Sequence, residues 1–456
     1  MNSKKKTSAK KVDTLKMGNV TSAEQPKLGL QNILDDLRYT NDELRIIHER
    51  FVDEMNKGWD LGKGKGAQAD QSSLKMISSY INILPRGNEE GTFFAVDLGG
   101  TNLRVLRVQL GSGVPTVREY REAIPARVMA ADATAEDLFD FIASACANLT
   151  TELTAESAPI PLGFTFSFAV AQSSIKSGEL IEWAKGFATQ GCIGHDPAKL
   201  LQDALDRLGL PLVVDALCND TVGTLMANAY QKKNKDCRIG VILGTGTNAA
   251  YSDPTLDDLI INVEWGGFDK LPRRTVYDEQ VDGLSSYPGR QLLEKMVSGL
   301  YLGEIVRVAA LAALSRNSCI AAIDERGRIE TADISHLLNG DKIQIAKSPL
   351  GELDEESLEI ITAISDAVIE RSAAVSAAVL GGVIHKATKG QDKVRCEVGI
   401  DGSLFTKGHK YKERLMRNLR RFYPNEEIVL DFSEDGSGMG AALVAAAVSR
   451  GRQISN

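Results

Sequence analysis

The first residues that could do chemistry lie in one turn, where eight consecutive residues read DLGGTNLR (97–104). Because glycine has no Cβ, the backbone N–H groups of such a turn can approach phosphate oxygens closely. Its Thr, Asn and Arg add donors and a positive charge, and its Asp suits hydrated Mg²⁺. Two adjacent glycines alone would indicate an ordinary hairpin, but the whole turn favours a phosphate site. The predicted nucleotide ligands are Asp97, Gly99, Gly100, Thr101, Asn102 and Arg104, with Asp97 binding the metal through water.

Three further glycine-rich turns read LGTGTN (243–248), IDGS (400–403) and DGSGMG (435–440). In the first of these, Thr245 is the natural phosphate donor, and Gly246 leaves the backbone accessible. The last turn opens an alanine-rich helix, whose N-terminal N–H groups could accept a nucleotide at Gly438. Its G-x-G-x-G spacing is not the G-x-G-x-x-G fingerprint of dinucleotide-binding proteins.

The elements that must position these turns form a repeated pattern. Apolar segments at 92–98 and 103–110 flank the first turn, and segments at 239–243 and 248–251 flank the second, so we predict two β-hairpins with glycines at positive φ. Other predicted strands are 162–168, 212–217, 394–400 and 428–432, and predicted helices are 31–55, 135–149, 197–208, 220–230, 289–314, 358–386 and 441–450. Two similar halves with a cleft between them are therefore expected.

Composition narrows the class of protein. A chain of 456 residues is too long for one ordinary core, and a net charge of -8 argues against a general nucleic-acid binder. The six cysteines form no CxxC pair, which favours reduced thiols and a cytoplasmic location. We find no run of about 18 apolar residues, so no transmembrane segment is expected. The lysine-rich residues 1–27 predict a disordered basic tail, and the glycine-lysine repeat at 62–66 predicts a linker.

In this order, the four turns resemble those of the actin, sugar-kinase and chaperone ATPase fold. That resemblance implies a two-lobed α/β fold of the ribonuclease H-like type, with mixed sheets flanked by helices around a central cleft. Five other segments are similar to hexokinases and glucokinases, and they read LGFTFSF (162–168), WAKGF (183–187), CNDTVGT (218–224), NVEWG (262–266) and PGRQLLEKM (288–296). The similarity extends from about residue 30 to 450, and each motif occurs once, which implies a single catalytic unit of the hexokinase type.

The resemblance implies transfer of the γ-phosphoryl group of Mg-ATP to the 6-hydroxyl of a D-hexose, as in the first step of glycolysis. Asp220 matches the catalytic base, and Lys185 matches the residue that neutralises charge on the transferring group. Both also match sugar contacts, together with Ser167, Asn219, Asn248, Glu264 and Glu294. Further matches to nucleotide contacts are Thr245, Asp401, Gly402 and Ser403. Glucose is the expected hexose, but the sequence does not rank it against mannose, fructose or glucosamine, and a homodimer is compatible with the resemblance.

Isolated acidic residues are usually solvated surface charges. Asp220 instead follows an apolar strand directly, and Glu264 adjoins Trp265-Gly266-Gly267 in a predicted tight turn. These positions favour a functional role for both carboxylates.

Two residues depart from the family pattern on one wall of the sugar site. Ala184 replaces the usual threonine, and the loss of one neutral hydrogen bond would cost on the order of 1 kcal/mol. Ala169 replaces the usual proline, which is expected to loosen the loop that positions Ser167. We therefore expect weaker sugar affinity or broader specificity, with catalysis retained.

The predicted domain organisation places large-lobe helices and the linker in 28–82, the small lobe in 83–220 with the helix 440–456, and the large lobe in 221–439. Sugar binding is expected to close the lobes and expel water. Two alternatives remain at this point: a weakly catalytic sugar sensor on the same fold, and an actin-like or chaperone-like ATPase. The sensor would bind glucose without turnover, and the ATPase would hydrolyse ATP without sugar.

Overall fold

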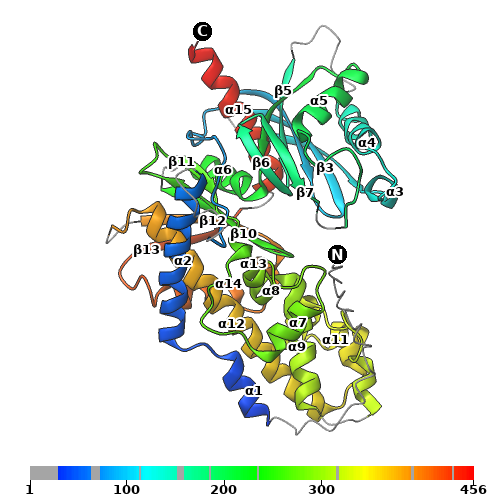
Figure 1. Ribbon diagram of the computed structural model, residues 1–456, viewed down its shortest axis with the longest axis vertical. Coiled ribbons are helices and arrows are strands. Elements are labelled where there is room, and N and C mark those ends of the chain that lie inside the picture. The colour runs from blue at the N-terminus through cyan, green and yellow to red at the C-terminus, as the bar shows by residue number, and fades with distance from the viewer. Residues whose placement is uncertain are drawn as a thin grey trace, which may run out of the picture.

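The computed structural model describes residues 29–62, 72–111, 114–150, 159–183, 186–233, 236–314, 318–391, 395–433 and 436–455. The predicted basic tail, most of the predicted linker, Ala184 and Lys185 lie outside these residues. Figure 1 shows two parts, one above the other, each containing a β-sheet with helices packed against it. The mixed α/β architecture in two parts is therefore confirmed.

The upper sheet is built around the first predicted hairpin. Its strands lie in the order β4 (Thr116–Ala123), β3 (Asn102–Leu110), β2 (Gly91–Leu98), β5 (Ile160–Phe166) and β8 (Leu212–Cys218). Strands β2 and β3 pair antiparallel as predicted, whereas β2, β5 and β8 run parallel. Apolar residues of α4 (Ala135–Ala147) and α5 (Pro197–Arg207) cover one face of this sheet, and residues of α6 (Asp220–Lys232) and α15 (Gly436–Ser455) cover the other.

The upper part also holds two small elements that the sequence pattern did not indicate. Helix α3 (Ala126–Met129) precedes α4, and strands β6 (Ala169–Ser174) and β7 (Ser177–Glu182) form a separate antiparallel hairpin. The short β6–β7 hairpin directly follows Ser167-Phe168, so it continues one wall of the predicted sugar site.

The second predicted hairpin forms the centre of the lower sheet. Its strands lie in the order β1 (Ile77–Ser78), β11 (Leu259–Asn262), β10 (Thr247–Asp253), β9 (Cys237–Leu243), β12 (Arg395–Asp401) and β13 (Glu427–Phe432). Strands β9, β12 and β13 are parallel, and β9 and β10 are antiparallel. Helix α6 contacts β9, β10 and β12, so it lies between the two sheets (Figure 1). The pairing of β1 with β11 joins residues 77–78 to the lower part. The exact boundaries of the two lobes stay a prediction.

The core of the lower part is helical. Its helices are α1 (Leu30–Leu37), α2 (Asn41–Gly62), α7 (Val276–Gly283), α8 (Leu292–Val297), α9 (Gly299–Ala313), α10 (Thr331–Leu338), α11 (Lys342–Lys347), α12 (Glu355–Ala387), α13 (Ser403–Lys407) and α14 (Tyr411–Leu419). Among the described residues, α12 is the helix long and apolar enough to cross a membrane, but most of its apolar stretch is buried. It packs against α2, α9, α14 and the lower sheet, as the central helix of a protein core does.

Two predicted helices were wrong in extent, each for a local reason. The predicted helix 31–55 is two helices, because Thr40 and Glu43 form a reciprocal capping box that starts α2 anew. The predicted helix 289–314 is also two, α8 and α9, which are separated at Ser298. There the N–H of Gly299 leaves the helix ladder and donates to the carbonyl of Gly244 at 2.8 Å, so the break ties α9 to the second glycine turn.

Glycines allow α15 to pack closely on its neighbours. A Cβ at Gly440 would lie 2.1 Å from the carbonyl oxygen of Gly223 on α6, and a Cβ at Gly163 on β5 would lie 2.0 Å from that of Ala441. These contacts are backbone to backbone, so they cannot be relieved by turning a side chain.

Replacing Gly440 with alanine is therefore expected to destabilise the protein by about 1–3 kcal/mol through overpacking. The matched control is Gly283→Ala at the end of α7, where a Cβ would meet nothing within 4 Å. That control should be neutral or slightly stabilising, because alanine favours a helix over glycine by about 1 kcal/mol. Chemical denaturation of both variants measures the difference, and equal stabilities would contradict the packing argument.

Candidate active site

The predicted catalytic carboxylate lies where two neighbouring parallel strands end. Ser167 directly follows β5, and Asp220 opens α6 just after β8. The Ser167 hydroxyl donates to Asp220 Oδ2 at 3.3 Å, so the two predicted residues meet although 53 positions separate them. Asn219 caps α6 by accepting from the N–H of Thr221 at 3.0 Å. The positive end of the helix dipole therefore stabilises the Asp220 carboxylate.

Asn248 connects this pair to the lower sheet. Its Nδ2 lies 3.4 Å from Asn219 Oδ1, 2.8 Å from Asn262 Oδ1 and 3.1 Å from Glu264 Oε1. Asn262 Nδ2 donates in turn to the same Glu264 oxygen at 2.9 Å. Asn219, Asn248 and Glu264, which were predicted as sugar ligands, therefore lie in one hydrogen-bonded set with a residue that was not predicted, Asn262.

The missed residue was detectable in the motif itself. Asn262 ends β11 two positions before Glu264, and alternate residues of an extended chain point to the same side. Its position therefore allowed contact with the Glu264 carboxylate. Because Asn262 contacts two predicted ligands, we interpret it as a positioning residue.

Replacing Asn262 with alanine should raise the hexose KM about tenfold, because the part-buried Glu264 carboxylate would lose one donor, which costs about 1–3 kcal/mol. The value of kcat should fall much less, since Asn262 does not contact Asp220 in the described hydrogen bonds. Steady-state kinetics with varied sugar measures this. An Asn262→Ala variant with unchanged KM would contradict the positioning role.

The predicted tight turn at Glu264 is confirmed. Glu264 adopts φ 57°, a left-handed conformation that is uncommon for residues other than glycine, and a 3₁₀ turn follows at Trp265–Gly267. Trp265 holds this turn, because its Nε1 donates to Thr247 Oγ1 at 2.8 Å while the ring is buried. Strained backbone conformations of this kind are concentrated at functional sites.

Glu294 approaches the same place from α8. Its Oε2 accepts from the N–H of Thr247 at 3.1 Å, next to Asn248. A Cβ at Gly246 would lie 2.9 Å from that oxygen, and a Cβ at Gly266 would lie 3.3 Å from the Glu294 Cβ. Gly246, predicted as a nucleotide contact, therefore makes room for Glu294 in this structure.

The first glycine turn lies at the same edge of the upper sheet as Asp220. Asp97, Thr165 and Cys218 are register partners on β2, β5 and β8, so they form a row across the sheet. Arg104 Nη1 lies 3.8 Å from Asp97 Oδ2, and its Nε donates to Glu119 at 3.1 Å. In this structure Arg104 therefore binds two carboxylates, and its predicted contact with phosphate stays a prediction.

Cys218 lies beside both predicted functional carboxylates. Burial raises the pKa of its thiol to about 12, a hydrogen bond with Thr165 opposes this, and the nearby charges of Asp97 and Asp220 add to it. The thiol is therefore neutral at physiological pH, and it places no further charge between the two carboxylates.

The second and third glycine turns meet at the edge of the lower sheet, where β9 and β12 run parallel. A Cβ at Gly244 would lie 3.3 Å from the Cα of Gly402, so the second and third turns lie side by side. Gly402 adopts φ 119°, and a Cβ there would lie 2.3 Å from the carbonyl oxygen of Leu243. The fourth turn reaches α6, since a Cβ at Gly436 would contact Thr224, and Gly438 is buried in the first turn of α15.

The prediction that the glycines of the two hairpin turns adopt positive φ was wrong. Neither Gly99 and Gly100 nor Gly244 and Gly246 are among the described residues with positive φ. At Gly244 the structure shows a close approach between two backbones instead, and at Gly246 it shows space for a carboxylate. At Gly244 and Gly246 a small residue is therefore needed for its size and not for its backbone conformation.

Together, these contacts place predicted sugar ligands from both sheets around the N-terminus of α6. The glycine turns lie at the carboxyl ends of the parallel strands, which is where open α/β sheets bind ligands. Carboxylates and amides that converge in this way suit a polyhydroxylated ligand, because they accept and donate several hydrogen bonds. Lys185, the other predicted catalytic residue, lies outside the described residues, two positions after Trp183.

Family models and known proteins agree with this arrangement. Two family models, both described as hexokinase, match residues 29–230 and 238–447. Hexokinase-7 of Oryza sativa subsp. japonica is 40% identical over 84% of this chain and 90% of its own length. Hexokinase-2 of Equus caballus is 37% identical over 91% of this chain, which spans only 47% of that longer protein.

Solved structures show the same similarity in three dimensions. A crystal structure of a hexokinase aligns over 92% of this chain and 98% of its own, with a TM-score of 0.82 and 32% identity. A hexokinase from Schistosoma mansoni complexed with glucose aligns over the same shares, with a TM-score of 0.79 and 31% identity. The chain therefore belongs to the hexokinase family of ATP-dependent hexose kinases.

Proposed function

We propose that this hexokinase transfers the γ-phosphoryl group of Mg-ATP to the 6-hydroxyl of D-glucose, giving glucose 6-phosphate and ADP as the first step of glycolysis. The observation that supports this most is the hydrogen-bonded set in which Ser167 meets Asp220 and Asn248 lies between Asn219 and Glu264. The complex of the Schistosoma mansoni hexokinase with glucose supports glucose as the sugar.

In the proposed mechanism, the oxygen of the sugar hydroxyl attacks the γ-phosphorus of ATP, and Asp220 accepts the proton of that hydroxyl. Ser167 keeps the carboxylate oriented by its hydrogen bond, and the carboxylate stands at the positive end of the α6 dipole. Glu264, Glu294 and the two asparagines accept and donate hydrogen bonds to the ring hydroxyls. A sugar that lacks one of these hydroxyls would leave a buried partner unsatisfied, which is how such sites discriminate.

The residues at the glycine turns fit a magnesium nucleotide. Asp97 is the last residue but one of β2, beside the first turn, and its side chain is 13% exposed, so a water-mediated contact with Mg²⁺ is within its reach. When bound, Mg²⁺ would neutralise negative charge on the phosphates of ATP. Thr245, Gly402 and Ser403 would bind phosphate oxygens at the neighbouring turns, and Lys185 would neutralise charge on the transferred group.

A coupled assay of ADP release tests the proposal with glucose, mannose, fructose, glucosamine and no sugar. We expect ADP release to require a sugar and kcat/KM to be highest with glucose. A higher kcat/KM with another hexose would contradict the substrate assignment. ADP release at the same rate without sugar, or glucose binding without turnover, would contradict the proposed reaction itself.

We also propose that the protein works in the cytoplasm. Cys146, Cys192, Cys218, Cys237 and Cys396 are free and buried, which suits a reducing compartment. Fractionation of cells that express the full chain tests this, and recovery with an organelle would contradict it.

A further inference from the structure

We propose that Glu182 and Arg290 form an ion pair that joins the two walls of the sugar site and stabilises the closed, sugar-bound arrangement. This inference rests on the proposed function, because it concerns the affinity of that same site for its sugar. Arg290 Nη2 donates to Glu182 Oε1 at 2.7 Å, although 108 positions separate the two residues. The pair is therefore a direct polar contact between the upper and lower parts.

Glu182 belongs to the upper wall. It is the last residue of β7 and the register partner of Ala169, two positions after Ser167. The next residue, Trp183, packs edge-on against Phe168 with ring centroids 4.9 Å apart, and its Nε1 donates to the carbonyl of Thr189 at 2.9 Å. A movement of Glu182 is therefore transmitted to the segment that carries Ser167.

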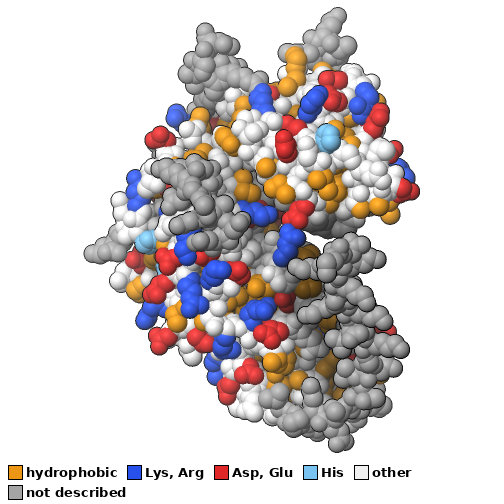
Figure 2. Space-filling model, viewed as in Figure 1, with side chains coloured by type: hydrophobic (Ala, Val, Ile, Leu, Met, Phe, Trp, Pro, Cys, Tyr) orange, Lys and Arg blue, Asp and Glu red, His pale blue; other side chains and the backbone are white. Residues whose placement is uncertain are grey.

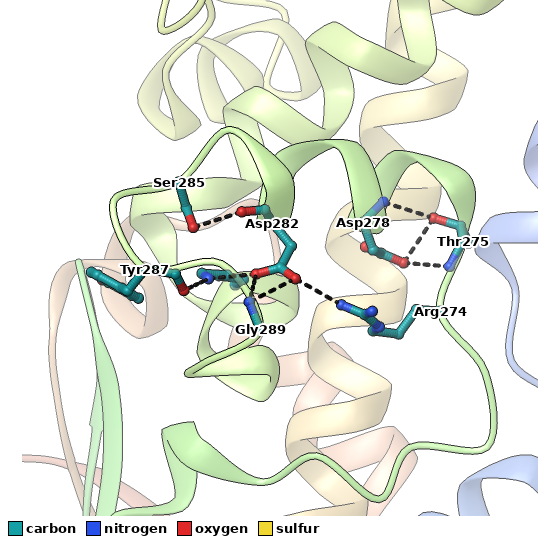
Figure 3. Close-up of polar contacts among 8 residues, drawn as sticks. Arg274, Thr275, Asp278, Asp282, Ser285, Tyr287 and Gly289 are labelled. Carbon is teal, nitrogen blue, oxygen red and sulfur yellow. Dashed lines mark hydrogen bonds and ion pairs between the residues drawn. The ribbon is translucent and has the colours of Figure 1, made fainter. Parts of the chain in front are cut away.

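Arg290 belongs to a loop of the lower part, residues 284–291, that buried charges hold in place. Figure 3 shows Asp282 at the centre of these contacts, where its carboxylate accepts from the N–H of Gly289 at 3.0 Å and from Arg274 at 3.2 Å. The buried ammonium of Lys295 donates to Asp282 at 2.6 Å and to the carbonyl of Tyr287 at 2.7 Å. The loop is thereby tied to both α7 and α8.

The pKa of Asp282 agrees with this arrangement. Burial alone would raise it, but the hydrogen bonds from Lys295, Gly289 and Arg274 outweigh burial and hold it below its ordinary value. Asp282 is therefore a carboxylate at physiological pH, as an anchor for two cations requires.

This loop leads directly into a predicted sugar ligand. Gln291 adopts a left-handed φ of 53°, α8 begins at Leu292, and Glu294 follows within the first turn of that helix. The distance along the chain from Arg290 to Glu294 is only four residues, and the intervening backbone is fixed at both ends. The ion pair therefore couples the wall with Ser167 to the wall with Glu294.

The exposure of the two side chains indicates that the ion pair affects the relative position of the two parts more than the stability of either one. Arg290 is 61% exposed and Glu182 is 41% exposed, and an ion pair this exposed contributes little to the stability of a folded core. The two residues are, however, attached to separately packed cores, so the energy of the pair acts on the position of one part relative to the other. Figure 2 shows the surface hollowed between these parts, with charged side chains of both signs near the hollow.

The test is a charge-swap series: Glu182→Arg, Arg290→Glu and the double variant with both changes. Each single variant places like charges face to face and should raise the sugar KM and the calorimetric Kd about five- to tenfold. The value of kcat should stay within about twofold, because binding of the ground state and the transition state is weakened equally. The double variant restores an attractive pair and should return both constants to within about twofold of the wild type.

Lys199→Glu is the matched control, because Lys199 pairs with Asp203 within helix α5 and joins no two parts. It should leave sugar affinity unchanged. Single variants with unchanged affinity, or a double variant whose defects simply add, would overturn the proposed coupling. Calorimetry reports sugar binding whether or not ATP is turned over, so a failure of the kinase proposal remains distinguishable from a failure of this one.

Discussion

Replacing Asp220 with alanine is expected to lower kcat about 10²–10⁴-fold, the usual contribution of a positioned general base. The carboxylate opens α6 and accepts from the Ser167 hydroxyl at 3.3 Å, so it is held at the meeting point of both walls. Alanine removes the proton acceptor while leaving the helix cap of Asn219 in place. Sugar affinity should change by less than about tenfold, since one hydrogen bond of several is lost.

Steady-state kinetics and calorimetry separate the two effects. Asp220→Asn serves as a second variant, because its amide has nearly the same shape as the carboxylate but cannot accept a proton. Asp203→Ala on the exposed surface of α5 is the control and should keep full activity. Wild-type turnover in the Asp220 variants would refute the assignment of the base.

Replacing Arg371 with methionine is expected to lower the free energy of unfolding by about 3–5 kcal/mol, because it leaves a buried charge unpaired. Arg371 on α12 donates to both oxygens of Asp278 at 2.9 and 2.8 Å, and the two side chains are only 1% and 2% exposed. Asp278 also accepts from Thr275 at the start of α7 (Figure 3). Chemical denaturation measures the loss.

The surface pair of Arg38 and Asp35 provides the matched control, and Arg38→Met should cost less than about 1 kcal/mol. The double variant Arg371→Met with Asp278→Leu should recover much of the lost stability, since replacing both partners removes the unpaired charge. A single variant as stable as the control would contradict the buried-pair argument.

The same pair predicts a dependence of stability on pH. Burial would raise the pKa of Asp278, but Arg371 and Thr275 outweigh burial and hold it below its ordinary value of 3.8. A lowered pKa in the folded state contributes stability above the unfolded value, and this contribution is lost as acid protonates the group. The stability difference between wild type and the double variant should therefore shrink below about pH 4.

Much of the site could be predicted because its residues stand at the ends of recognisable elements. Asp220 follows an apolar strand and begins a helix, and the turn at 97–104 separates two apolar strands, so local sequence placed both correctly. Each of these predictions depended on neighbours in the chain. The alignment of Asp97 with Thr165 and Cys218 depends on the order of β2, β5 and β8 in the sheet. It could therefore not be predicted from the ends of the strands alone.

The rest depended on contacts between distant segments. The split between α8 and α9 could not be predicted, because it is caused by the carbonyl of Gly244, 55 positions before Gly299. The ion pair of Glu182 and Arg290 joins two charges that look like ordinary surface residues in the sequence. The β6–β7 hairpin could not be predicted, because its polar residues obscure the apolar–polar alternation that is typical of a strand.

The most direct test of the central claim follows the reaction by ³¹P NMR with glucose and Mg-ATP. We predict that glucose 6-phosphate and ADP accumulate in equal amounts, with no inorganic phosphate, because the hydroxyl held by Asp220 attacks in place of water. The accumulation of ADP and inorganic phosphate without a sugar phosphate, or no consumption of ATP at all, would contradict the account.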